Sequence, residues 1–251
     1  MKILFSPSEA KHEGGLYPPI NPHSFSLAGH YQTVLPVLER YQAYLRTADL
    51  PALERLFGIK KPHEIERLRT LDLFSERTLP ALERYSGVAY DYLDYPSLPE
   101  EAQTFLKEHL ILFSNLFGPL LGGDLIPFYK LKQTEPIGTF RTESYYKEKE
   151  SPLLDALLEG EFIVDLRAGY YLKFYTLPYP SITMKFLKNG RVISHWAKAW
   201  RGRIVRTLAM ERPQNEAMLQ EIRFEGLQIE EIRKTRLKTE YIYRIEEPRS
   251  S

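Results

Sequence analysis

Apolar residues in the first half of this chain recur with the spacing of helices. Side chains three or four positions apart share one face of a helix, and the apolar ones between residues 31 and 93 follow this rule, beginning with Val34, Leu35, Leu38, Tyr41 and Leu45. Ser97 with Glu100 three positions later has the pattern of a capping box, so a further helix is expected to begin there and end near Gly118. The segment 31–118 is therefore predicted to be mainly helical.

Strand patterns lie outside this helical segment. Lys2–Phe5 is a short apolar run. Residues that favour strands, β-branched and aromatic, are concentrated in three later segments, which are 161–166, 170–176 and 239–245. Two alternating runs meet at Asn189 and Gly190, a pair that suits the type I′ turn of a β-hairpin. We expect Lys2–Phe5, the strand at 162–166 and this hairpin to join one central sheet.

The order of the elements predicts an α/β protein of mixed type. Short helices are expected near residues 152–159 and 215–221, between the later strands. The sequence has no internal repeat, and its Pro-rich segments do not divide it cleanly. Residues 1–251 are therefore expected to form a single compact domain, with a central mixed sheet and surrounding helices.

The segment that follows the hairpin, HWAKAWRGRIVR at residues 195–206, is predicted to be helical. At 100° per residue one side of this helix is apolar, and it carries Trp196, Ala197, Trp200, Ile204 and Leu208. Both tryptophans are expected to anchor the helix in the core. Lys198 and Arg201 lie on the opposite side, flanking Gly202. Glycine costs about 1 kcal/mol relative to alanine inside a helix, which indicates that a ligand or another backbone comes close there.

Basic residues are concentrated around this helix. The net charge of the chain is only +1, but residues 166–210 contain nine Lys and Arg side chains and no Asp or Glu. A solvated helix face is one interpretation. Cations without acidic neighbours also attract phosphates, and binding of that kind depends on salt. The sequence leaves both interpretations open.

Several classes of site are excluded or disfavoured. The chain has no cysteine, which excludes disulfides and thiolate metal sites. Its six histidines show no pairing at metal-ligand spacing, and neither a Walker loop nor G-x-G-x-x-G occurs. We therefore expect no metal and no cofactor. The amino terminus has too few apolar residues for a signal peptide, and the longest apolar stretch is interrupted by Asn115, Pro119, a glycine pair and Asp124. A cytoplasmic protein that does not associate with membranes is expected.

Four motifs in this order resemble the bacterial peroxide stress protein family known as YaaA. They are SPSEAK at residues 6–11, RYSGVAYDYL at 84–93, LFGPLLGGDLIPFYKL at 116–131 and KNGRVISHWAKAWRGRIVR at 188–206. The resemblance implies a compact α/β architecture nicknamed the cantaloupe fold, with a positively charged cleft and a helix-hairpin-helix element. It also implies a cytoplasmic protein that binds DNA and helps to keep unincorporated iron low.

The resemblance also supplies candidate site residues. Those matching the family's basic motifs are expected to bind DNA or another phosphate-bearing ligand: Lys198, Arg201, Gly202, Arg206, Lys173, Lys130 and Lys11. Three more are candidates for supporting positions in the cleft, namely Ser6, Glu9 and Tyr129. The sequence departs from the family pattern at Ala199, Ser86 and the NLFGPLLGG stretch, so a basic cleft is better supported than helix-hairpin-helix binding.

Two functions follow from these residues. The first is a monomeric, non-enzymatic stress protein that binds the phosphates of double-stranded DNA without strong base preference. The second is an enzyme acting on a phosphorylated or nucleic-acid substrate, with Glu9 as a base and with cations that stabilise negative charge, namely Lys11, Lys173, Lys198 and Arg201. The enzyme requires Glu9 and Lys11 to lie beside Lys198 and Arg201.

Overall fold

A large mixed sheet forms the centre of the protein. The computed structural model describes residues 1–188, 190–192 and 194–246. Its sheet strands are β1 (Lys2–Phe5), β4 (Leu110–Ser114), β5 (Gly118–Leu121), β7 (Ile163–Asp165), β8 (Ser181–Lys188), β9 (Arg191–Val192), β10 (Leu227–Lys234) and β11 (Lys238–Ile245). Their order is β10-β11-β8-β7-β1-β4-β5, with β9 paired to β8. A smaller sheet joins β2 (Tyr17–Pro19), β3 (Arg77–Pro80) and β6 (Leu125–Pro127).

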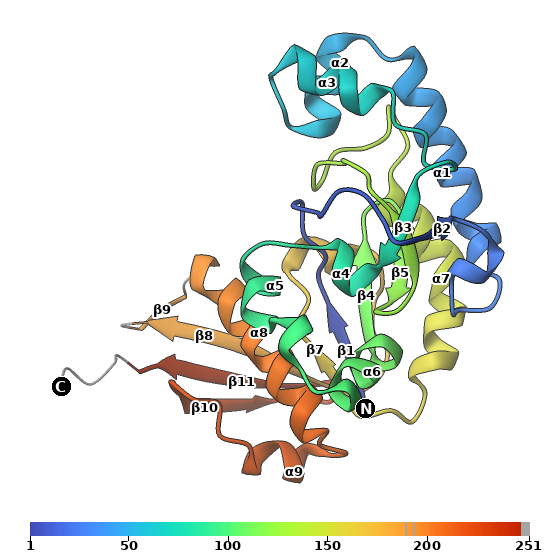
Figure 1. The fold of residues 1–251 in the computed structure, drawn as a ribbon. Coiled ribbons are helices and arrows are strands. Elements are labelled where there is room, and N and C mark those ends of the chain that lie inside the picture. The colour runs from blue at the N-terminus through green and yellow to red at the C-terminus, as the bar shows by residue number, and fades with distance from the viewer. Residues whose placement is uncertain (189, 193, 247–251) are drawn as a thin grey trace.

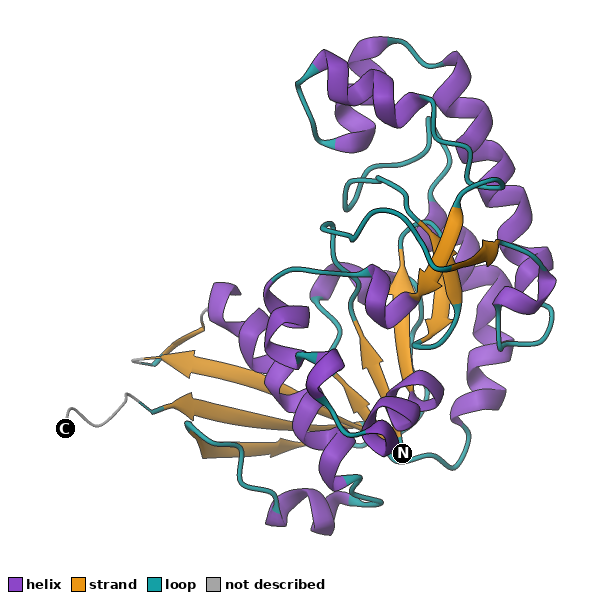
Figure 2. Ribbon diagram, in the orientation of Figure 1, coloured by secondary structure: helices purple, strands orange, loops and turns teal. Residues whose placement is uncertain are grey.

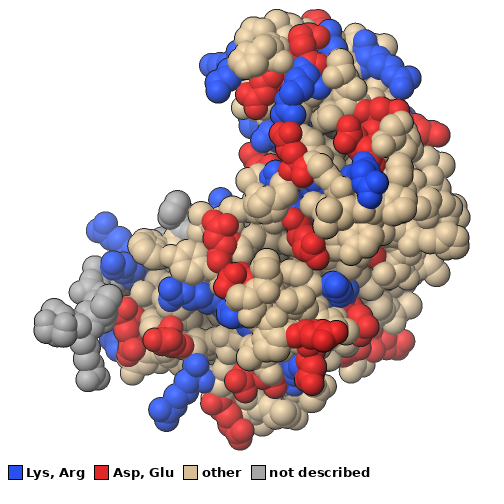
Figure 3. Space-filling view, viewed as in Figure 1, with Lys and Arg blue, Asp and Glu red and all other residues tan. Residues whose placement is uncertain are grey.

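Helices surround the central sheet (Figure 2). They are α1 (His30–Thr47), α2 (Leu50–Phe57), α3 (Pro62–Arg69), α4 (Ala81–Arg84), α5 (Val88–Leu93), α6 (Glu100–His109), α7 (Thr142–Leu158), α8 (Ser194–Glu211) and α9 (Glu216–Glu221). Three short 3₁₀ helices are η1 (Pro22–Ser24), η2 (Tyr95–Ser97) and η3 (Gly169–Lys173). In Figure 1, α5, α6 and α8 lie together in front of the sheet, while α2 and α3 extend from the end of α1. The outline is a crescent, hollowed between α2–α3 and the β8–β9 hairpin (Figure 3).

The core of the protein is centred on β1. All four residues of this strand are buried, because β1 lies between two parallel neighbours, β4 and β7. Buried apolar side chains from the sheet, from α1 and from α8 belong to one connected cluster. The fold is thus a mixed α/β arrangement with a large mixed sheet and surrounding helices, as expected.

Several local predictions are confirmed. Strands β1 and β7 and the β8–β9 hairpin join the same sheet, and β11 covers the predicted final strand. The hairpin pairs Lys188 with Arg191, and Gly190 has a φ of 70°; Asn189 itself lies outside the described residues. Helix α9 follows Asn215, whose side chain accepts a hydrogen bond from the Met218 amide.

The predicted helix over residues 97–118 is wrong in its second half. Helix α6 begins at Glu100 and ends at His109, and the following residues Leu110–Ser114 form β4. This strand is buried along its whole length, and a fully buried apolar run has no period that separates strand from helix. The Ser97 hydroxyl does not cap α6, because it binds Asp94 instead.

Two more segments differ from expectation. The aromatic run 170–176 was expected to be a strand, but its first residues lie in η3, and Tyr171, Phe174 and Tyr175 are buried against the core. Tertiary packing rather than strand pairing accounts for its aromatic content. The helix expected at 152–159 begins ten residues earlier, at Thr142, and contains Pro152.

Candidate functional site

The topology places a candidate site where β1 and β7 end. The chain leaves β1 toward β4 on one side and leaves β7 toward β8 on the other, so the direction of the connections reverses between these two parallel strands. In open α/β sheets, ligands bind outside the carboxyl ends of strands at such a switch point. The residues that follow β1 and β7 are therefore the first to consider.

Ser6 links the loops that follow β1 and β7. It directly follows β1, and its hydroxyl accepts a hydrogen bond from the Ala168 amide at 2.8 Å. Its main-chain oxygen accepts one from the Tyr90 hydroxyl at 3.0 Å. Ser6 thus holds the loops after β1 and β7 together, which is a positioning role.

The amine of Lys11, in the loop that follows Ser6, lies over the rings of two tyrosines. Its Nζ atom is 4.1 Å from the ring centre of Tyr129 and 5.3 Å from that of Tyr85. The two tyrosine hydroxyls are 2.9 Å apart, and the Tyr129 hydroxyl is also 2.9 Å from Ser114 Oγ at the end of β4. We call Lys11, Tyr85, Tyr129 and Ser114 the lysine–tyrosine cluster.

Burial dominates the electrostatics of this cluster. It lowers the pKa of Lys11 to about 7, with the positive charge of Lys130 acting in the same direction and the charge of Glu9 opposing it. Burial raises the pKa of Tyr85 to about 12 and also raises the pKa of Tyr129 well above its ordinary value. The tyrosines therefore stay neutral near pH 7, while the Lys11 amine is divided between its charged and neutral forms.

Glu9 belongs to the same region but is exposed. Its carboxylate accepts a hydrogen bond from the Gln133 amide at 2.9 Å, which connects the loop after β1 to the loop after β6. Lys130 lies in that second loop, and its main-chain oxygen accepts a hydrogen bond from Tyr41. Four predicted residues, Glu9, Lys11, Tyr129 and Lys130, are thus brought together.

Arg201 approaches the switch point from α8. Its guanidinium is half-buried; burial lowers its pKa, and the nearby charge of Asp165 opposes that shift. Asp165 is the last residue of β7 and is paired with Arg167 at 2.7 Å. Within the described residues no hydrogen bond or ion pair joins Arg201 or Lys198 to Lys11 or Glu9.

Gly202 is explained by helix packing. A Cβ atom on this residue would lie 2.0 Å from the main-chain oxygen of Ala89 and 3.0 Å from the amide nitrogen of Leu93. Helices α5 and α8 therefore cross with their backbones almost in contact, which only glycine permits. Of the two explanations that the sequence left open, the close neighbour is another backbone.

The remaining candidates lie in different surroundings. Lys198 is exposed on α8. Arg206 donates hydrogen bonds to the main-chain oxygens of Leu93 and Asp94 at 3.0 and 2.9 Å, so it caps the end of α5. Lys173 is exposed, with its Nζ atom 5.6 Å from the ring centre of Tyr170.

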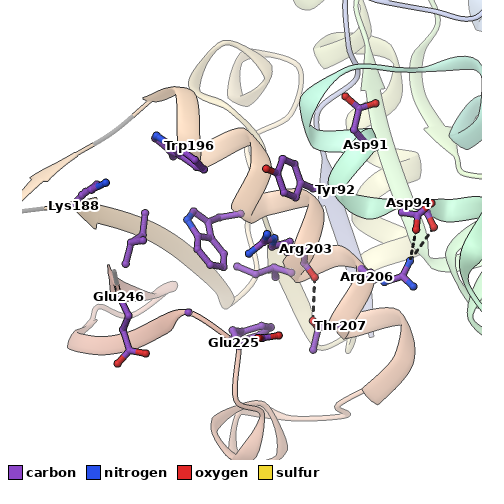
Figure 4. A pocket seen from close by; sticks show the side chains of 15 residues that line it. Asp91, Tyr92, Asp94, Lys188, Trp196, Arg203, Arg206, Thr207, Glu225 and Glu246 are labelled. Carbon is purple, nitrogen blue, oxygen red and sulfur yellow. Dashed lines mark hydrogen bonds and ion pairs between the residues drawn. The ribbon is translucent and has the colours of Figure 1, made fainter. Parts of the chain in front are cut away.

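A pocket of about 930 Å³ lies on the other side of α8 (Figure 4). Arg203 crosses it, with its guanidinium 4.8 Å from the ring centre of Tyr92 and 4.9 Å from that of Trp200. The lining combines basic residues with acidic ones: Lys188, Arg203, Arg206, Asp91, Asp94, Glu225 and Glu246. This pocket is therefore not a purely basic surface.

The two tryptophans occupy different environments. Trp200 is 6% exposed and belongs to the core, as expected. The expectation for Trp196 is wrong, because this residue is 51% exposed at the rim of the pocket. It lies near the beginning of α8, before the helix makes its close contact with α5 at Gly202.

Sequence reasoning missed the residue that fixes Lys11. Arg84 is completely buried, and its guanidinium donates to the main-chain oxygens of His12, Gly14 and Ile126. Residues 10–12 pair with residues 84–86, with Lys11 opposite Tyr85. The only sequence signal was the position of Arg84 at the start of the RYSG motif.

Two features are absent from the part of the chain that the structure describes. It contains no group of three or more acidic or histidine side chains that could hold a metal ion. None of its helices has both the length and the apolar character that crossing a bilayer requires.

Together, the fold and the strand-end residues define a mixed α/β protein with a candidate site at a topological switch point. A family model described as peroxide stress protein YaaA matches residues 1–233. The chain belongs to this family.

Relatives from several bacteria match over most of their length. An uncharacterized protein of Campylobacter jejuni is 42% identical over 245 residues, covering 98% of this chain and 99% of that protein. A UPF0246 protein of Corynebacterium glutamicum is 31% identical over 226 residues, covering 84% and 85%. One from Streptomyces coelicolor is 28% identical over 215 residues, covering 83% and 82%.

Proposed function

We propose that this protein acts in peroxide stress by binding the phosphates of duplex DNA through the cations of α8. Family membership supports the role in peroxide stress. The proposal includes the cytoplasm as the place of action, a monomer as the acting form and a link to low levels of unincorporated iron. Lys198 and Arg201 are the principal contacts, while Gly202 and Arg206 position α8 against α5.

The proposal rests on three cations of α8 that have no ion-pair partner among the described residues. Lys198, Arg201 and Arg203 follow one another along the helix, which has no acidic residue before Glu211. None of the three forms an ion pair within the described residues. Figure 3 shows Lys and Arg side chains around the adjoining hairpin, with acidic side chains among them. Phosphates would supply the partner that no ion pair supplies to these three side chains.

Salt dependence of duplex binding tests this proposal. The affinity for a short duplex, measured by fluorescence anisotropy between about 50 and 200 mM salt, should fall steeply, because each neutralised phosphate releases counterions. It should vary little between duplexes of different sequence, because phosphate contacts carry no base information. An affinity that does not change with salt, or no binding at low salt, would exclude the proposal.

The lysine–tyrosine cluster supports a second candidate, an enzyme. Lys11 and Glu9 lie at the switch point where α/β enzymes bind their ligands. Arg201 could hold a phosphate of the substrate from the Asp165 side, without touching Lys11. Turnover of a phosphorylated substrate that is lost in Lys11→Arg but retained in Lys198→Ala would favour this candidate over simple DNA binding.

A further inference from the structure

Packing contacts hold the walls of the pocket beside α8 together. Helix α5 supplies Tyr92 and is fixed against α8 by the backbone contact at Gly202. The turn before β10 meets the end of β11, where the Glu246 amide donates to the Gly226 oxygen at 3.0 Å. A Cβ atom on Gly226 would lie 2.9 Å from the Trp200 ring, so this turn also packs against α8. The pocket is thus preformed, and its volume of about 930 Å³ is in the range of small-molecule sites.

Arg203 is held in this pocket by aromatic rings and not by a carboxylate. Its guanidinium is 4.8 Å from the ring centre of Tyr92 and 4.9 Å from that of Trp200. Within the described residues this guanidinium donates no hydrogen bond and forms no ion pair. Contact with the two rings positions the group while leaving its N–H donors available. A planar set of donors of this kind pairs with both oxygens of a phosphate or a carboxylate.

Trp196 presents an aromatic surface at the rim of the same pocket (Figure 4). About half of this residue is exposed, whereas a tryptophan that serves only packing is largely buried. An exposed aromatic ring is a surface on which nucleobases stack, because every base has a flat π face. The rim of the pocket therefore suits a flat aromatic ligand.

The charged lining favours a ligand that carries both an anion and hydrogen-bond donors. Arg203 and Lys188 attract an anionic group. Glu225 and Glu246 form no ion pair within the described residues, so their carboxylates disfavour a purely anionic ligand and accept hydrogen bonds from N–H groups. A nucleotide combines the two features, because its phosphate is an anion and adenine, cytosine and guanine carry amino groups.

We propose that this pocket binds a nucleotide whose base carries an amino group. The base stacks on Trp196, and its amino group donates to the carboxylate of Glu225 or Glu246. The phosphate pairs with Arg203 and Lys188. The ligand is a free nucleotide or an unpaired nucleotide of a DNA strand, since both present the same groups to the pocket.

The pocket is separate from the surface of α8 that is proposed to bind duplex phosphates. Lys198 and Arg201 project from the opposite side of the helix, and neither lines the pocket. The double variant Lys198→Ala/Arg201→Ala should therefore keep the wild-type affinity for nucleotides even if it no longer binds duplex DNA. The two proposals can thus fail independently.

Isothermal titration calorimetry of the whole protein with CMP tests the inference. CMP should bind, and Trp196→Ala should weaken its binding by about tenfold, as removal of a stacked ring typically does. Arg203→Lys keeps the charge but loses the planar contact with Tyr92 and Trp200, so it should also weaken binding. Thermal melting verifies that both variants fold.

Other ligands test the base and the phosphate separately. Ribose 5-phosphate lacks the base, and UMP has a carbonyl where CMP has an amino group, so both should bind the wild-type protein more weakly than CMP. The preference for CMP over UMP should shrink in Glu225→Gln/Glu246→Gln, because an amide can donate to the carbonyl of UMP.

Competition distinguishes the two sources of the nucleotide. Displacement of bound CMP by a single-stranded oligodeoxycytidylate identifies an unpaired DNA nucleotide as the ligand, and no displacement identifies the free nucleotide. The inference is wrong if CMP does not bind, if ribose 5-phosphate binds as well as CMP, or if Trp196→Ala and Arg203→Lys both bind CMP as the wild type does.

Discussion

Gly202 in α8 lies directly against the main-chain oxygen of Ala89 in α5, so closely that a Cβ atom on the glycine would lie 2.0 Å from that oxygen. The contact fixes the position of α8, and with it the directions of Lys198 and Arg201. It also explains a glycine in the middle of an 18-residue helix, which ordinary helix propensity disfavours.

Gly202→Ala should therefore destabilise the protein, although alanine is the better helix former. Backbone cannot move aside as a flexible side chain can, and overpacking of this kind typically costs about 1–3 kcal/mol. Thermal melting measures the loss. Gly169→Ala is the matched control, because a Cβ atom there would meet nothing within 4 Å. A Gly202→Ala variant that melts at or above the wild-type temperature would contradict this account of the helix crossing.

The two tryptophans should respond very differently to truncation. Trp200 is 6% exposed within the core, so Trp200→Ala should lower the free energy of unfolding by about 3–5 kcal/mol. Trp196 is 51% exposed, and Trp196→Ala should change it by no more than about 0.5 kcal/mol. Urea denaturation of the two variants measures both values. Equal losses would show that the beginning of α8 is packed in another way.

Lys11 should make stability depend on pH in a defined window. Burial lowers its pKa from 10.5 to about 7, so between these values the folded protein binds fewer protons here than the unfolded chain does. The protonated Lys11 side chain therefore lowers the free energy of unfolding below about pH 7, and this unfavourable contribution decreases as the pH rises toward 10.5. Lys11→Met removes the group, so the variant's advantage in unfolding free energy over the wild type should be largest near pH 7 and shrink toward about pH 10.

Urea denaturation at several pH values measures this difference. One pKa unit corresponds to about 1.4 kcal/mol, so the difference should shrink by a few kcal/mol at most. Lys60→Met, which removes an exposed lysine from the loop between α2 and α3, serves as the control. A difference between Lys11→Met and wild type that stays constant with pH would show that Lys11 is an ordinary lysine.

Local sequence signals predicted the parts of the fold that local interactions determine. The hairpin around Gly190 and the cap at Asn215 both depend on residues a few positions apart. The strand Leu110–Ser114 could not be recognised, because burial along its whole length removes any period from its apolar pattern. Strand β10 was missed because most of its residues are polar and exposed.

The candidate site also divides into residues that sequence patterns indicated and contacts between distant segments that they did not. Resemblance to the family indicated Lys11, Tyr129, Lys130 and Glu9, and the structure brings these four together. Helical spacing placed Lys198 and Arg201 away from the core but could not reveal that Ala89 is the neighbour of Gly202. The role of Arg84 was beyond prediction, because its partners are main-chain oxygens, which leave no trace in the sequence.

The salt dependence of DNA binding by Lys198→Ala/Arg201→Ala tests the central proposal most directly. Both side chains are clear of the close contact between α5 and α8, so the variant should fold, which thermal melting verifies. Each lost phosphate contact should flatten the slope of log affinity against log salt by about 0.9 on duplex DNA, hence by about 1.8 for the pair. Lys107→Ala/Lys149→Ala removes the same charge from α6 and α7 and should keep the wild-type slope. If the α8 variant folds and binds with the wild-type slope, its cations do not contact DNA and the proposed function is wrong.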